Sequence, residues 1–188
     1  MKIIIAFILL LATVRSFGQI EFGVSSFSMS IKGTSNLHDW ESSVKELKAT
    51  GAIGIDAAEL NSVKSVSVEI PVKAIKSTKG RVMDNKTYDA FKANDNPFIT
   101  YTLESATVTK KGDGYDVATS GKLTMAGVTN KVDMMVRARV EADGSVTFSG
   151  SKKLKLSEFK MKRPSALLGT VTVGDEVEVV FKVSLKPN

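Results

Sequence analysis

Apolar and polar residues alternate over most of the chain, and this two-residue period is typical of β-strands with one buried face. Turn residues separate the alternating segments, as at Gly112-Asp113-Gly114 and Asp143-Gly144. The Asp-Gly pair is a strong hairpin signal. The pattern predicts strands over residues 24–32, 44–55, 63–72, 98–109, 115–123, 128–141, 145–156 and 175–186.

Short strands joined by turns at regular spacing indicate a β-sandwich or a β-barrel. The last strand, 175–186, is long and amphipathic, and leaving it as an open edge would promote aggregation. Pairing it with the first strand removes that edge. We therefore predict an all-β fold, a single antiparallel barrel of about eight strands, wide enough inside for packed side chains or one small ligand.

One segment breaks the alternation and predicts a short helical insertion over residues 84–92. Asp84 is suited to the N-cap position. Tyr88 and Phe91 stand three residues apart and so share one face of the helix. Pro97 follows, and the residue before a proline disfavours the helical conformation.

The N-terminus predicts a secretory signal peptide over residues 1–18, which leaves 19–188 as one domain. Its apolar run is too short to span a bilayer, so we expect no stable membrane insertion of the mature chain. The chain contains no cysteine and one histidine. A catalytic thiolate, a cysteine zinc site and a multi-histidine metal site are thereby excluded. We expect no cofactor.

Charges are mixed along the chain, with 26 lysines and arginines against 20 acidic residues. This mixture is typical of a solvated surface and does not favour nucleic-acid binding. The densest basic region is interpreted as a solvated strand edge, with attraction to anionic headgroups at a barrel opening as the alternative. It contains Lys152, Lys153, Lys155, Lys160, Lys162 and Arg163.

The residues predicted to face inward are almost all aliphatic or aromatic. They are compatible with a solid core and equally with an apolar cavity for a hydrocarbon chain. The predicted inward residues are Phe27, Met29, Val66, Val68, Ile70, Ile99, Tyr101, Leu103, Val132, Met134, Val136, Phe148, Val177, Val179 and Phe181.

Three motifs carry a resemblance to a known family: GTSNLHDW at 33–40, PFITY at 97–101 and LTMAGVTNKV at 123–132. Together they resemble the YceI-like family of lipocalin-like, polyisoprenoid-binding proteins, over roughly residues 24–186. The resemblance implies a barrel whose lumen binds an isoprenoid or a fatty-acyl chain, in the periplasm or outside the cell. It also implies that the helical insertion, with Tyr88 and Phe91, lies near the barrel mouth.

The segment from Gly33 to Val44 is expected to be irregular, and it contains His38, Asp39 and Trp40. Catalysis by His38 is disfavoured, because neighbouring residues in an extended chain point to opposite sides and Asp39 is poorly placed to orient it. Two interpretations stay open. The polar pair either satisfies backbone groups of a bend while Trp40 closes one barrel end, or it forms the polar end of a ligand pocket with Trp40 as its wall.

These observations predict an exported lipid-binding protein, a carrier or a store, with no enzymatic activity of its own. The alternative is a stress-associated structural or interaction protein with a filled barrel. The ligand-binding residues are expected among the inward set, with Trp40, Tyr88 and Phe91 added and His38 and Asp39 at the polar end. The expected partner is an isoprenoid or another long-chain lipid, and a homodimer is left open.

Overall fold

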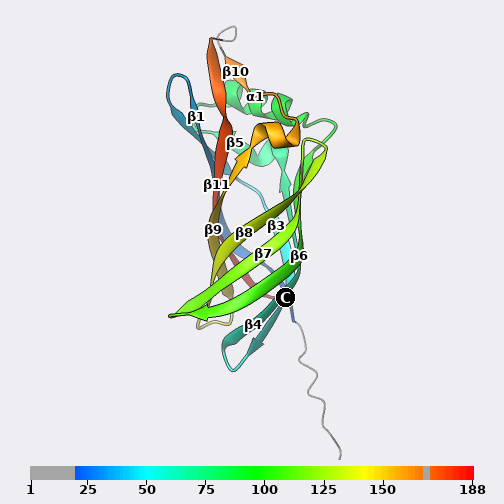
Figure 1. The fold of residues 1–188 in the computed structure, drawn as a ribbon, viewed down its shortest axis with the longest axis vertical. Helices are drawn as coiled ribbons and strands as arrows, with labels where there is room; N and C mark the ends of the chain where they lie inside the picture. Colours follow the sequence, from blue (N-terminus) through cyan, green and yellow to red (C-terminus); the bar gives the residue numbers. More distant parts are fainter. Residues whose placement is uncertain (1–19, 167–169) are drawn as a thin grey trace, which may run out of the picture.

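The computed structural model describes residues 20–166 and 170–188, and the predicted signal peptide lies outside them. Eight antiparallel strands close into a barrel, which confirms the predicted fold class (Figure 1). Closure is made by the first and last strands, which pair from Phe22↔Pro187 to Ser35↔Val173. The barrel strands are β1 (Ile20–Ser35), β3 (Lys48–Asp56), β4 (Glu59–Pro71), β6 (Phe98–Lys111), β7 (Gly114–Met125), β8 (Val128–Val140), β9 (Val146–Lys155) and β11 (Val171–Pro187).

The alternation along β11 sets which side chains face the barrel interior. Val179, Phe181 and Val183 are half-buried on one face and pack against the core. Their register partners on β1 are Ile31, Met29 and Phe27. Because successive residues of a strand point to opposite faces, one register places the apolar sets of both strands inside together.

The segment after Gly33 is a hairpin, so the expectation of an irregular loop there is wrong. Strand β1 continues to Ser35, and β2 (Asp39–Val44) returns beside it with Gly33 opposite Trp40. The turn closes locally, because the Ser35 hydroxyl oxygen accepts hydrogen bonds from the backbone N–H groups of Leu37 (3.2 Å) and His38 (3.1 Å). The short strand β5 (Ile75–Ser77) pairs with the edge of β2 that faces away from β1.

The helix α1 (Arg81–Phe91) begins three residues earlier than predicted, with Gly80 at its N-cap. Asp84 as N-cap is therefore wrong. This carboxylate is buried inside the first turn and accepts a hydrogen bond from the backbone N–H of Ser77 at 2.7 Å, which joins the helix to β5. The helix ends at Phe91, after which Lys92 adopts the left-handed conformation.

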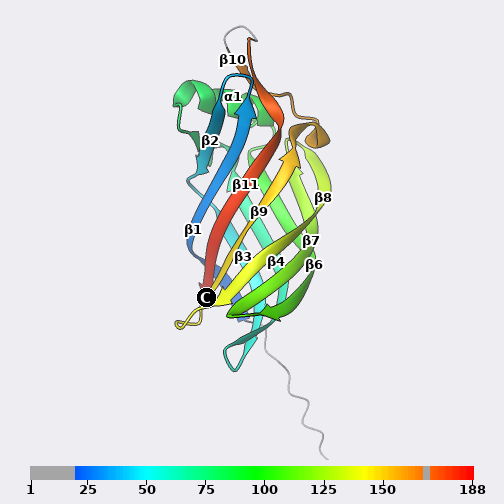
Figure 2. The same cartoon turned by 60° about the vertical axis from the view of Figure 1, so that its left-hand side comes forward.

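Helix α1 lies across the end of the barrel opposite the C-terminus (Figures 1 and 2). The remaining short elements are η1 (Val72–Ala74), η2 (Leu156–Phe159) and β10 (Ser165–Ala166). In the described part of the chain, no helix is long and apolar enough to cross a membrane.

Fully buried apolar side chains pack at both ends of the barrel. At the C-terminal end, Phe22, Ile53 and Val146 are at most 1% exposed. At the α1 end, Val72 and Ile75 are equally buried. The structure leaves internal space beside these clusters, and Ile75 lines part of it.

Candidate ligand-binding cavity

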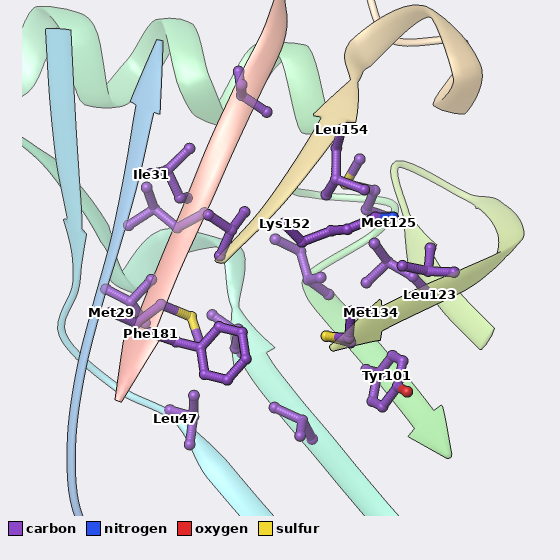
Figure 3. Close-up of a pocket in the computed structure, with 18 of the residues that line it drawn as sticks. Met29, Ile31, Leu47, Tyr101, Leu123, Met125, Met134, Lys152, Leu154 and Phe181 are labelled. Atoms are coloured by element: carbon purple, nitrogen blue, oxygen red, sulfur yellow. The ribbon is translucent and has the colours of Figure 1, made fainter. Parts of the chain in front are cut away.

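An elongated cavity of about 270 Å³ lies inside the barrel. Its lining is mostly apolar and comes from all eight barrel strands, β2, β5, α1 and η2 (Figure 3). The volume is close to the lower end of the range for small-molecule pockets, about 300–1,000 Å³. The barrel is therefore hollow, and its cavity extends to the α1 end, where Thr87, Ala90 and Phe91 line it.

Most of the residues predicted to bind ligand lie on this wall. Those that line the cavity are Met29, Trp40, Val68, Ile70, Phe91, Ile99, Tyr101, Leu103, Met134, Val136, Phe148, Val179 and Phe181. Val66, Val132 and Val177 from the predicted inward set line it as well.

Phe27 and Tyr88 are not part of the lining. Phe27 packs against the hydrophobic core. The hydroxyl of Tyr88 donates to the carbonyl oxygen of Lys73 (3.0 Å) and accepts from Nζ of Lys76 (2.6 Å). Tyr88 therefore fastens α1 to η1 and β5. The helix presents another side to the cavity, through Thr87, Ala90 and Phe91.

The structure does not bring His38 and Asp39 to the cavity. Both are exposed at the β1–β2 hairpin. Trp40, the next residue, turns inward and lines the cavity. Its indole N–H donates to the carbonyl oxygen of Thr34 at 3.0 Å, and its ring occupies the space above Gly33, where a Cβ atom would come within 2.4 Å of the ring. Only Trp40 of this motif can contact a molecule in the lumen.

Tyr101 and Lys152 are the two largest polar side chains in the cavity wall, which also contains Ser42, Thr87 and Thr119. The Tyr101 hydroxyl is buried and has no hydrogen-bond partner in the described structure. Burial raises the pKa of Tyr101, and the neighbouring Thr119 hydroxyl opposes that shift. Thr119 itself donates to the carbonyl oxygen of Met134 at 3.1 Å. A buried hydroxyl without a partner carries a desolvation cost of about 1–3 kcal/mol.

The second polar side chain is Lys152, which the sequence interpretation placed on a solvated strand edge. It occupies an inward position of β9, between Gly150 and Leu154, and its stem lines the cavity. The inward position of Lys152 can be read from the sequence, because residues 148, 150, 152 and 154 are spaced two apart and so share one face of the strand. The sequence interpretation gave more weight to the positive charge of Lys152 than to its position in the inward phase of the strand.

Several lining residues were not among the predicted ligand-binding residues. Leu47 lies in the break between β2 and β3 and Ala49 lies on β3, within the predicted strand 44–55, whereas Met161 and Pro164 lie after η2, in a stretch with no strand pattern. Among residues 20–166 and 170–188, no three histidine, aspartate or glutamate side chains are grouped as metal ligands.

Comparison with known structures gives the same architecture. The chain is 24% identical to Burkholderia cenocepacia BcnA, with a TM-score of 0.64 over 84% of this chain and 95% of that one. A polyisoprenoid-binding domain from Saccharophagus degradans, implicated in plant cell wall breakdown, matches at 12% identity and a TM-score of 0.64, over 91% and 100% of the two chains. The YceI protein of Campylobacter jejuni matches at 24% identity and 0.58, over 78% and 85%.

A comparison with curated proteins finds no match. At the level of sequence families, the model of the YceI-like domain matches residues 15–185, which is nearly the whole chain. The protein therefore belongs to the YceI-like family.

Proposed function

We propose that the protein is an exported lipid-binding protein that holds an isoprenoid or fatty-acyl chain in the barrel lumen and carries or stores it without transforming it. The observation that supports this most directly is the apolar cavity inside the barrel. Relatives of the same fold include a domain described as polyisoprenoid-binding. Export is the part of the proposal supported by the N-terminal apolar segment.

The size of the cavity makes an occupant energetically favourable. For an enclosed cavity, roughly 24 cal/mol per Å³ applied to about 270 Å³ gives about 6 kcal/mol of missing packing, and this is an upper bound here because the cavity is partly open. Total stabilities of domains are about 5–15 kcal/mol. A hydrocarbon chain that fills this space recovers a large part of the deficit, whereas water gains little from walls that offer few polar partners.

The test is native mass spectrometry of the protein purified from its own host, followed by solvent extraction and identification of the released molecule. A bound hydrocarbon chain supports the proposal. Extracted protein should then regain a higher melting temperature when geranylgeraniol or palmitate is added, because a ligand that binds only the folded state stabilises it. Repeated isolation without ligand, and no thermal shift, would favour a structural or interaction role instead.

N-terminal sequencing of the protein recovered outside the cytoplasm tests export. The proposal expects Gln19 as the first residue. Retention of Met1 on a membrane-inserted product would contradict it.

A further inference from the structure

The barrel wall has a seam between β8 and β9. The two strands pair only from Arg137↔Ser149 to Val140↔Val146. Figure 2 shows them diverging from there toward the end with α1. Across the divergence, the side-chain amide of Asn130 donates to the carbonyl oxygen of Glu158 in η2 at 2.8 Å. We define the seam as residues 131–135 of β8 and 150–154 of β9, which have no ladder pairing with each other in the described structure.

Lys152 crosses this seam. It stands opposite Val179 of β11, in the inward register, and its stem lines the cavity (Figure 3). Its Nζ donates to the backbone carbonyl oxygen of Asp133 at 2.7 Å. Among the described residues, Lys152 is the one charged side chain in the cavity lining. The ammonium thus lies at the boundary between lumen and solvent, as expected for a long cationic side chain with an apolar stem.

The charge of Lys152 is not neutralised within the described part of the protein. No carboxylate lies within ion-pair distance of it, in contrast to Lys153, which pairs with Glu176 at 3.0 Å. An ammonium group carries three N–H donors, and the carbonyl of Asp133 uses one. Donors therefore remain for a ligand at the edge of the cavity.

The Tyr101 hydroxyl is a second hydrogen-bond donor close to this part of β8. The Tyr101 hydroxyl rests over Gly121, 2.6 Å from where a Cβ atom would be, and Gly121 pairs with Val132 of β8. Among the described residues, the Tyr101 hydroxyl has no hydrogen-bond partner. Tyr101, Thr119 and Lys152 bring three polar groups together beside residues 132–134. This is where the polar end of an amphiphilic ligand would find partners.

We infer that Lys152 binds the anionic headgroup of a single-chain amphiphile, a carboxylate or a phosphate, whose hydrocarbon tail occupies the cavity. This inference rests on the proposed lipid-binding function. A bond between an ammonium and an anion is charge-assisted and is about twice as strong as a neutral hydrogen bond. The anion would replace or supplement the Asp133 carbonyl as the partner of Nζ.

The test compares cis-parinaric acid, whose fluorescence rises in apolar surroundings, with its methyl ester, which has the same chain and no charge. Both are titrated into lipid-extracted protein. The wild type should bind the acid at least tenfold more tightly than the ester. Lys152→Met, which keeps an unbranched apolar stem, should remove this preference, and Lys152→Arg should retain it.

Lys153→Met is the matched control. It removes the same charge from the next residue of the same strand, on the outer face, where the lysine pairs with Glu176. The control should keep the preference for the acid. Thermal unfolding checks that each variant is folded. If Lys152→Met does not fold, the comparison of acid with ester on the wild type and Lys152→Arg still decides the question.

Competition experiments with the bound probe distinguish a phosphate headgroup from a carboxylate headgroup. Displacement of the probe by geranylgeranyl phosphate at lower concentration than by palmitate supports a phosphate headgroup, and the reverse supports a carboxylate. Equal binding of acid and ester to the wild type, or a preference that survives Lys152→Met, overturns this inference and leaves lipid binding intact. Failure of both probes to bind overturns the proposed function and this inference together.

Discussion

Two phenylalanines offer the same chemical change in two different surroundings. Phe22 is 1% exposed in the packed C-terminal end of the barrel, whereas Phe181 is half-buried and lines the cavity. Truncation of a packed phenylalanine to alanine costs about 3–5 kcal/mol, which combines a transfer contribution with a contribution from the new void. We expect Phe22→Ala to fall in that range.

Phe181→Ala should cost much less in the lipid-free protein. The space it vacates joins a cavity that already exists, so the contribution from a new void is small. The transfer contribution for a fully buried phenylalanine is about 1.5–3 kcal/mol, and half-burial reduces it further. We therefore expect a loss of about 1–2 kcal/mol.

Equilibrium unfolding in urea, with and without ligand, measures both variants. A ligand at one hundred times its Kd stabilises the wild type by about 2.7 kcal/mol. Phe22→Ala should keep that increment, and Phe181→Ala should reduce it because the ring forms part of the wall that contacts the chain. If the two truncations cost the same without ligand and neither changes the increment, the lumen of the protein in solution is filled and our reasoning is refuted.

Three further predictions follow from single side chains. Trp40→Ala should lower stability by about 2 kcal/mol in chemical denaturation, because it removes a half-buried ring that covers Gly33 and donates to Thr34, while part of the vacated space joins the cavity; a neutral result would contradict this. Tyr101→Phe should raise the stability of the lipid-free protein by about 1 kcal/mol, since it removes an unpaired buried hydroxyl, and a loss in calorimetry would refute it. Hydrogen bonds from the Ser157 hydroxyl and N–H hold the pKa of Asp175 below its usual range. The stabilising contribution of this carboxylate is therefore present at neutral pH and is lost as pH falls through its folded-state pKa. The wild type should therefore lose melting temperature below about pH 4 more steeply than Asp175→Asn, and parallel pH profiles would rule this out.

The barrel could be predicted from sequence because its strands have one wet and one dry face. Along β11, apolar residues hold one phase from Val177 to Leu185, and only one register with β1 buries both apolar sets. Closure followed from the need to protect this strand edge. The same reasoning located most of the cavity wall, since the wall is the inward phase of each strand.

The hairpin after Gly33 could not be predicted in this way. Glycine in a strand was interpreted as a strand end, whereas here it makes room for the ring of Trp40 on the paired strand. That role depends on the cross-strand register, which the local pattern does not contain. The turn between β3 and β4 is a similar case, because Ala57 and Ala58 adopt φ of 49° and 63°, in a turn that normally selects asparagine and glycine.

Glycine opposite an aromatic ring also explains why the barrel is hollow. Trp40 lies over Gly33, Tyr101 over Gly121, and Phe181 over Gly150, each glycine on a neighbouring strand. In each pair, a Cβ atom on the glycine would stand 2.4–3.1 Å from the ring. The missing side chain lets the ring lean along the wall instead of projecting to the barrel axis, an arrangement used to cover glycines in curved sheets.

Aromatic residues would otherwise fill the lumen of an eight-stranded barrel, which is just wide enough for its own side chains. Three rings drawn toward the wall free the space that a hydrocarbon chain needs, and the lysine at the seam supplies a charged group beside it. The choice between a filled and a hollow barrel therefore depends on pairs of residues in neighbouring strands. The alternation within one strand shows which residues face inward. Only the register between paired strands shows how far their side chains reach into the lumen.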